Sequence, residues 1–292
     1  MLEPQRLPIN ELQFQMKKPC VLVLTANPIE RGIFLRWMAE HNYGPVLTYM
    51  IEGYAFNVQR IAVNGIDVSI VHADPGKTGE ELTRQIINTA CSVIQPTCIC
   101  EVGICYGFNR RRNTVGTVFL SESITVFRIN FRDSDKNSIV TLEPEMETEK
   151  QPADNFVQAL RGRLLYTMIP SLISREDRPF FAKAEIGKLI SVNSLISNKQ
   201  VKEVLLGCYE NSRTKPLGGE MEGAGLLKSE IVQGKGFDRW LIIKSICDWG
   251  EVKNNLEKDK EKNELIKNSI QALAMCNSVG VFEKLLPELC EV

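Results

Sequence analysis

Histidine is the scarcest residue in this sequence, with only His41 and His72 among 292 residues. Acid–base chemistry centred on an imidazole is therefore poorly supplied, and we expect carboxylates to carry protons instead. Closely spaced metal ligands are also lacking, because the nine scattered cysteines include no Cys-x-x-Cys pair from which a structural zinc site could be built. Their odd number predicts reduced, mostly buried thiols, as is usual in a cytosolic chain.

Long apolar runs and an excess of charge are missing too. The apolar run at 21–24 is far too short to span a bilayer, and residues 1–19 contain no apolar stretch of the kind found in signal peptides. Thirty-five Lys and Arg against 36 Asp and Glu leave a net charge of −1, which gives no global electrostatic reason to bind nucleic acid or an anionic membrane. We therefore expect a cytoplasmic protein with neither of these partners.

The remaining composition, 43% apolar and 24% charged, is that of a globular protein long enough to bury a large core. We expect an N-terminal extension at 1–18 and one domain at 19–290, since no internal repeat or clear interdomain linker is present. The polar segment 133–153 predicts a surface insertion. The charged run 251–264 predicts a solvated loop, with a mobile lid as the alternative.

Strand and helix patterns alternate along the chain. We predict strands at 20–26, 56–63, 66–73, 98–105, 115–124, 125–131, 185–192 and 239–247, and helices at 33–38, 79–94, 155–166, 198–209, 219–232 and 264–286. Asn64-Gly65 joins two alternating runs and predicts a tight hairpin. Strands alternating with helices, together with hairpins, indicate an α/β fold with one mixed sheet and helices on both faces.

Acidic side chains follow several of the predicted strand ends. Glu30 comes after the first strand, Asp248 ends the last, and Glu220 and Glu222 lie in the glycine-rich stretch 218–225. Each is a weak signal alone, because an acid at such a place often caps a helix or complements its dipole. Ligands of such sheets bind outside the carboxyl ends of the strands, so one cleft can gather these acids. Glycine in a helix costs about 1 kcal/mol relative to alanine, so four glycines here indicate a close approach of backbone or ligand.

In order and spacing, these segments resemble the nucleoside phosphorylase and nucleosidase superfamily over residues 20–286. Glu220-Met221-Glu222, followed by a strand that ends in Cys247-Asp248, is the combination that carries the resemblance. It implies a single nucleoside phosphorylase-like domain with a twisted, partly barrel-like mixed sheet. It also implies a homo-oligomer.

Similarity to the 5′-methylthioadenosine/S-adenosylhomocysteine nucleosidases implies roles for individual residues. Asp248 would be the acid that protonates purine N7, Glu222 would accept hydrogen bonds from the ribose hydroxyls, and Met221 would pack under the sugar. Glu30 lies where that branch has the carboxylate that orients the attacking water. Lys244 occupies the place of a family arginine near that water.

The segment 187–196 resembles the one that closes over the base in that branch, which makes Val192, Leu195 and Ile196 expected apolar contacts. The other expected substrate-binding residues are Glu220, Cys105, Gly103 and Trp249. The chemistry needs no metal and no organic cofactor.

Departures from the family pattern favour hydrolysis. Phosphorylases of this superfamily bind phosphate with arginines and a serine, whereas the matching places here hold Glu30, Glu101 and Ile104. Two acids facing a phosphate dianion would repel it. We therefore predict a purine nucleosidase that uses water and acts on an adenine-type nucleoside or on a nucleotide such as ATP or AMP. A phosphate-dependent phosphorylase and a catalytically silent nucleotide-binding module are the alternatives.

The sequences at 102–107 and 247–250 are most similar to nucleosidase domains that serve as effectors in bacterial stress or antiviral modules. This similarity makes a nucleotide substrate one option. It leaves open whether the activity is constitutive or needs a regulatory partner protein. Arg110, Arg111 and Arg112 either form a solvated turn or reach a 5′-phosphate.

Overall fold

The structure is a computed structural model of the chain, and it describes residues 19–41, 45–74, 79–134, 137–144, 150–164, 169–170, 181–193, 199–250 and 260–291. The expected extension 1–18, the expected base contacts Leu195 and Ile196, and residues 251–259 of the charged run lie outside the described residues. No helix in the described ranges is both long and apolar enough to cross a membrane.

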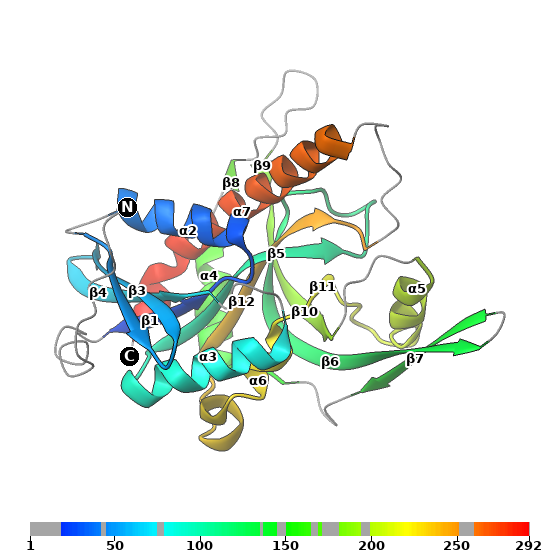
Figure 1. The fold of residues 1–292 in the computed structure, drawn as a ribbon, viewed down its shortest axis with the longest axis horizontal. Coiled ribbons are helices and arrows are strands. Elements are labelled where there is room, and N and C mark those ends of the chain that lie inside the picture. The colour runs from blue at the N-terminus through cyan, green and yellow to red at the C-terminus, as the bar shows by residue number, and fades with distance from the viewer. Residues whose placement is uncertain are drawn as a thin grey trace.

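Strands and helices alternate as predicted (Figure 1). The strands are β1 (Cys20–Leu24), β2 (Leu47–Ile51), β3 (Tyr54–Val63), β4 (Ile66–Ala73), β5 (Cys98–Gly107), β6 (Val118–Ser134), β7 (Asn137–Pro144), β8 (Ile169–Pro170), β9 (Phe181–Ala182), β10 (Ala184–Val192), β11 (Gly218–Glu220) and β12 (Trp240–Asp248). The helices are α2 (Pro28–Glu40), α3 (Glu80–Val93), α4 (Asp154–Leu164), α5 (Lys199–Gly207), α6 (Gly223–Leu227), the π-helical turn η1 (Glu230–Gly234) and α7 (Lys260–Cys290).

One mixed sheet organises the fold. Its strand order is β11-β10-β6-β12-β5-β1-β4-β3-β2, and β7 pairs with β6 outside this path. The central strands β12, β5, β1 and β4 run parallel to one another, so their carboxyl ends lie at one edge. β11 also pairs antiparallel with β5, which curls this half of the sheet into a partial ring. The predicted mixed, partly barrel-like α/β sheet is confirmed.

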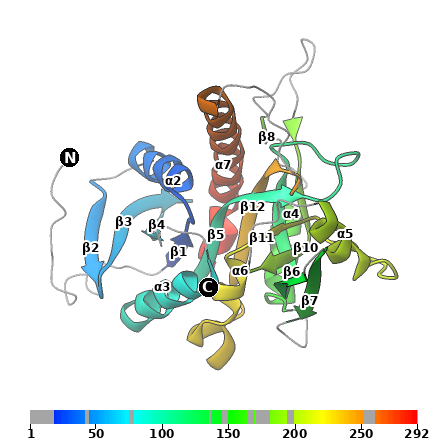
Figure 2. The ribbon, with the colours of Figure 1, turned by 45° about the vertical axis from the view of Figure 1, so that its right-hand side comes forward.

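The core has two layers because successive side chains of a strand point to opposite faces. In β1, Val21 and Val23 pack in the cluster that also contains residues of α2, α4 and α7. The alternate residues Leu22 and Leu24 pack with residues of α3 and α6 on the other face. Figure 2 shows α2 and α7 on one side of β1 and β5, with α3 and α6 on the other.

The hairpin predicted at Asn64-Gly65 is confirmed. Asn64 has φ 51° and Gly65 has φ 80°, the positive values that a tight two-residue turn requires. The strands on either side pair antiparallel, with Val63 opposite Ile66.

The predicted helix at 219–232 is wrong. The chain forms the three-residue strand β11, a turn at 221–222 and then α6, which is only five residues long. The glycines explain the difference, because they let the backbone pack closely against neighbouring segments. A Cβ on Gly219 would lie 2.0 Å from the Tyr106 hydroxyl, and one on Gly225 would lie 2.2 Å from the Glu80 carbonyl oxygen.

The structure also differs from the sequence prediction in β6, in β7 and at the start of α7. Residues 115–131 were expected to form two strands, but the single strand β6 runs through most of this stretch. The insertion 133–153 contains β7, which pairs with β6 because its Ile, Val and Thr residues favour a strand. The last helix begins at Lys260, so residues 260–264 are helical and not part of a loop.

Candidate active site

Glu30 lies in the first turn of α2, just past the carboxyl end of β1. Asn27 caps this helix through its side-chain oxygen, which accepts hydrogen bonds from the N–H groups of Ile29 and Glu30. The Glu30 carboxylate accepts the N–H of Ala26 at 2.6 Å and the N–H of Ile104 at 3.0 Å. Glu30 is 1% exposed, and burial raises its pKa. Two backbone donors, one just past β1 and one within β5, therefore fix this carboxylate.

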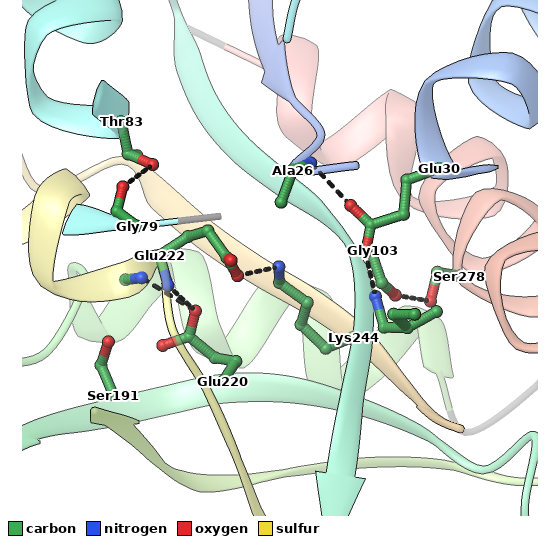
Figure 3. A network of polar contacts seen from close by, with 12 residues as sticks. Ala26, Glu30, Gly79, Thr83, Gly103, Ser191, Glu220, Glu222, Lys244 and Ser278 are labelled. Carbon is green, nitrogen blue, oxygen red and sulfur yellow. Dashed lines mark hydrogen bonds and ion pairs between the residues drawn. The ribbon is translucent and has the colours of Figure 1, made fainter. Parts of the chain in front are cut away.

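Gly103 permits the close approach of Glu30 to β5. A Cβ at this position would lie 2.7 Å from Glu30 Oε1, which is too close for any side chain. From the other direction, Ser278 of α7 donates its hydroxyl to the Gly103 carbonyl oxygen at 2.7 Å (Figure 3). The backbone of β5 is thus hydrogen-bonded to α7 on one side, and on the other side Gly103 has no side chain between it and the Glu30 carboxylate.

Lys244 and Glu222 form a buried ion pair. Lys244 Nζ, on β12, lies 2.9 Å from Glu222 Oε2, at the start of α6 (Figure 3). Burial lowers the pKa of Lys244, but the negative charges of Glu222 and Glu30 outweigh this effect and raise it well above its usual value. Lys244 is therefore a permanent cation within the site.

Two more carboxyl groups are buried beside this pair. Glu220 Oε2 accepts the N–H groups of Glu222 and Gly223, both at 2.8 Å. Burial, followed by the charge of Glu222, raises the pKa of Glu220 to about 7. Neither oxygen of Glu101 has a hydrogen-bond partner among the described residues. Burial, followed by the charge of Glu220, raises the pKa of Glu101 well above its usual value.

Four buried carboxyl groups therefore surround one buried ammonium group, and the four are Glu30, Glu101, Glu220 and Glu222. Full ionisation would leave an uncompensated negative charge in a desolvated site, which is costly. The raised pKa values of Glu101 and Glu220 favour their protonated forms and reduce that charge. Such a site stabilises developing positive charge and disfavours a bound anion.

Asp248 ends β12 at the same edge of the sheet, four residues after Lys244. Its Oδ1 accepts the N–H of Gly250 at 2.9 Å, and the Cys247 thiol lies 3.7 Å from its Oδ2. Asp248 is half-buried, unlike the four glutamates. Contacts from the residues on either side therefore hold both oxygens of this carboxyl group at the end of the strand.

The remaining expected site residues fall into two groups. Met221 and Val192 pack in one apolar cluster with Tyr106, so the structure brings these expected sugar and base contacts together. Cys105 instead lies in the core beside Ile246, where its side chain is fully covered. Trp249 is half-buried and directly follows Asp248.

Three side chains that support this arrangement were not among the predicted catalytic or substrate-binding residues, although Glu101 was noted as an acid at the place of a phosphate-binding residue. Glu101 left a signal, because it is an acid within the otherwise apolar strand β5. Ser191 accepts the N–H of Ala224 at 2.9 Å and so holds the start of α6 against β10. Ser191 and Ser278 had no distinguishing pattern in the sequence, since their role depends on contacts between distant segments.

Both histidines lie outside this cluster of carboxyl groups. His72 is fully buried between Thr25 and Asn57, and burial lowers its pKa to about 3. In the part of the chain that the structure describes, no group of three or more His, Cys, Asp or Glu side chains is arranged to hold a metal ion.

Comparison with solved structures identifies the fold. The 5′-methylthioadenosine/S-adenosyl homocysteine nucleosidase of Helicobacter pylori superposes with a TM-score of 0.65 at 13% identity, covering 94% of this chain and 100% of that chain. The futalosine hydrolase of the same organism gives 0.63 at 12% identity, covering 92% and 97%. This chain has the nucleoside phosphorylase and nucleosidase fold. The nucleosidase of Neisseria meningitidis, in complex with methylthio-immucillin-A, shares this fold with a TM-score of 0.61 at 14% identity, covering 92% and 98%.

Comparison with curated sequences gives one distant relative. It is the death domain-containing ATP nucleosidase of Amphimedon queenslandica, 20% identical over 254 residues, which cover 82% of this chain and 44% of that protein. The chain thus spans less than half the length of this curated relative. No protein-family model matches the chain.

Proposed function

We propose that this chain is a purine nucleosidase that hydrolyses the N-ribosidic bond of an adenine nucleoside or nucleotide. The observation that carries the proposal is the Glu30 carboxylate, held by two N–H groups beside the buried Lys244–Glu222 pair. The fold it shares with solved nucleosidases supports the reaction class. The sequence similarity to a protein named an ATP nucleosidase supports a nucleotide as the substrate.

The reaction requires a nucleophile on one side of the ribose and an acid at the base. Glu30 orients a water molecule and accepts its proton as the water oxygen bonds to C1′. Asp248 donates a proton to purine N7 while the C1′–N9 bond breaks and its electron pair passes to the base. The products are the free purine and a sugar with a hydroxyl at C1′.

The remaining acids stabilise the sugar during bond cleavage. The ribose becomes oxocarbenium-like, so positive charge develops next to the buried carboxylates. Glu222 accepts hydrogen bonds from the ribose hydroxyls, and Met221 packs under the sugar. Lys244 holds the Glu222 carboxylate in place through their 2.9 Å contact.

A phosphorylase reaction fits this cluster poorly. Phosphate would have to replace water beside Glu30, in a site where four carboxyl groups outnumber one lysine. The repulsion of a dianion by buried carboxylates is strong because the surrounding dielectric is low.

Product analysis by chromatography tests the proposal directly. The protein is incubated with adenosine, methylthioadenosine, AMP and ATP, each with and without inorganic phosphate. We expect free adenine at a rate that does not depend on phosphate, and the best substrate defines the 5′ group. Ribose 1-phosphate formed only with phosphate would establish a phosphorylase instead. No base release from any substrate would favour the catalytically silent nucleotide-binding module.

A further inference from the structure

A cavity of about 470 Å³ opens just past the end of β5. Its walls come from the turn after β5, from α5 and from the segment before β11. Five cationic side chains line it, namely Arg110, Arg111, Arg112, Lys202 and Lys215. None of the described lining residues is acidic. We call this cavity the basic pocket.

The turn that carries the three arginines is fixed by its own hydrogen bonds. The Asn109 side-chain oxygen accepts the N–H of Arg111 at 3.0 Å and the N–H of Arg112 at 3.1 Å. Arg112 also lies 3.4 Å from a carboxylate oxygen of Glu185, outside the lining. The three arginines are exposed, as a solvated turn predicts, and they also line the basic pocket.

Two cations of the basic pocket contact the residue next to Asp248. The Arg110 guanidinium lies 5.5 Å from the centre of the Trp249 ring, within the range of a cation–π contact. Lys202 is only 6% exposed, and its Nζ donates to the Trp249 carbonyl oxygen at 3.0 Å. A ligand that binds these two cations would therefore act on both the ring and the backbone of Trp249.

The charge of the basic pocket selects the kind of ligand. Five cationic side chains line one cavity, so an anion that enters it gains favourable charge–charge contacts. Arginine guanidinium groups and lysine ammonium groups both donate charge-assisted hydrogen bonds to phosphate oxygens. Several cations in one cavity match a chain of phosphates better than a single carboxylate.

The position of the basic pocket separates it from the 5′ end of a substrate. Along β5, Gly103 lies against Glu30, whereas Gly107 lies against the Trp249 ring. These glycines are four residues apart, or about 13 Å along a strand. On the proposed function, the ribose lies near Glu30 and the base near Asp248, so the pocket lies beyond the base. The 5′-phosphates leave the ribose at the end away from the base, so they would point away from Arg110, Arg111 and Arg112.

We propose that the basic pocket is a second ligand site, which binds the polyphosphate group of a molecule other than the substrate. The bound polyphosphate contacts Arg110 and Lys202 and thereby sets the position of Trp249 and of the neighbouring Asp248. The existence of the site is independent of the enzyme's reaction, whereas its influence on Asp248 rests on the proposed function.

Isothermal titration calorimetry of the full chain tests the site without using activity. The probes are inorganic tripolyphosphate and CTP, a nucleotide without a purine. We expect the R111A/K215A variant to bind tripolyphosphate at least tenfold more weakly than the wild type, since it lacks two charge-assisted contacts. The control is R36A/R60A, which removes two exposed arginines of α2 and β3 and should bind like the wild type. Tighter binding of CTP than of tripolyphosphate would identify a nucleotide as the natural ligand, and equal binding a free polyphosphate.

Two outcomes of the titration would overturn the site. One is that the wild type shows no binding of either probe. The other is that R111A/K215A binds tripolyphosphate as tightly as R36A/R60A does, because attraction would then depend only on overall charge.

Two further measurements test the contact with Trp249 and the separation from the substrate. Tripolyphosphate should change the tryptophan fluorescence of the wild type and not that of Trp249→Phe, and a change that persists in this variant would overturn the contact. If the enzyme cleaves ATP, R111A/K215A should keep the wild-type KM for ATP. A KM raised for ATP but not for adenosine would show that the pocket holds the substrate's own phosphates. Lack of cleavage would refute the proposed function and leave the binding result intact.

Discussion

Lys244 Nζ lies 2.9 Å from Glu222 Oε2, and this contact joins the central strand β12 to the turn between β11 and α6. The lysine also faces the carboxyl groups of Glu30, Glu220 and Glu101. One side chain thus ties together segments more than 200 residues apart in the sequence, from Glu30 to Lys244. The charge balance of the whole cluster depends on it.

Removing the Lys244 charge should destabilise the protein. We expect Lys244→Met to lower the free energy of unfolding by about 3–5 kcal/mol, because it leaves buried carboxylates without their counter-charge. Urea unfolding at pH 7 measures the change. Lys244→Arg keeps the charge and serves as the control, with a smaller expected loss. A Lys244→Met variant as stable as the wild type would show that the carboxyl groups are neutral without the lysine.

The raised pKa of Glu220 predicts a pH dependence of stability. The pKa rises from 4.5 to about 7, so the folded state holds this proton more tightly than the unfolded state does. The resulting stabilisation is complete below pH 4.5 and is lost as the pH rises to about 7. It amounts to about 3 kcal/mol for this group. Glu220→Gln cannot titrate, so its free energy of unfolding should fall less over this window in urea titrations at several pH values. Parallel curves for variant and wild type would contradict the shifted pKa.

Asp248→Asn tests the proposed acid. The amide oxygen can still accept the Gly250 N–H at the present 2.9 Å, so the fold should be preserved. Loss of the proton donor should lower kcat by about 100- to 10,000-fold. Adenine release measured by chromatography gives the rate, and Cys247→Ser, which changes the neighbouring side chain, should stay within a few-fold of the wild type. If Asp248→Asn cleaves at the wild-type rate, Asp248 is not the acid.

Gly103→Ala tests the placement of Glu30 without changing any functional group. The added methyl group would lie 2.7 Å from Glu30 Oε1, so the carboxylate must move away from the Ile104 N–H. We expect at least a tenfold loss of kcat, since a misplaced base costs orientation. Gly32→Ala is the matched control: no atom lies within 4 Å of its added Cβ. This exposed helical site should gain up to about 1 kcal/mol of stability and keep its activity. Equal activity of both variants would remove Glu30 from the mechanism.

Patterns within short stretches of the sequence correctly predicted several helices and strands. β1, the Asn64-Gly65 hairpin and α3 follow from apolar runs, turn chemistry and helical periodicity, and the structure confirms them. The prediction of a helix at 219–232 was wrong because its glycines allow close contacts with Tyr106 and Glu80, which are distant in the sequence. The glycine-rich sequence at 218–225 indicates close packing, but it does not indicate which residues pack against it.

The candidate site likewise combines residues that local motifs predict with interactions that depend on tertiary packing. The acids Glu30, Glu222 and Asp248 were predicted as site residues because each follows a strand end or lies in an unusual motif. Their electrostatics could not be predicted, because the pairing of Glu222 with Lys244 and the burial of Glu101 depend on packing between β5, β12 and α6. The expected homo-oligomer, a regulatory partner protein and base contacts by Leu195 and Ile196 stay predictions.

The strand β11 is hydrogen-bonded along both of its edges, to β10 on one side and to β5 on the other. A strand of three residues would ordinarily fray, but this one is paired on both sides and cannot leave the partial ring without opening two ladders together. Glu220, its last residue, is thus held within paired strands, and Glu222 lies in the turn that directly follows them. The sugar-binding wall of the proposed site is therefore preorganised, and any motion that admits a substrate must come from the other walls.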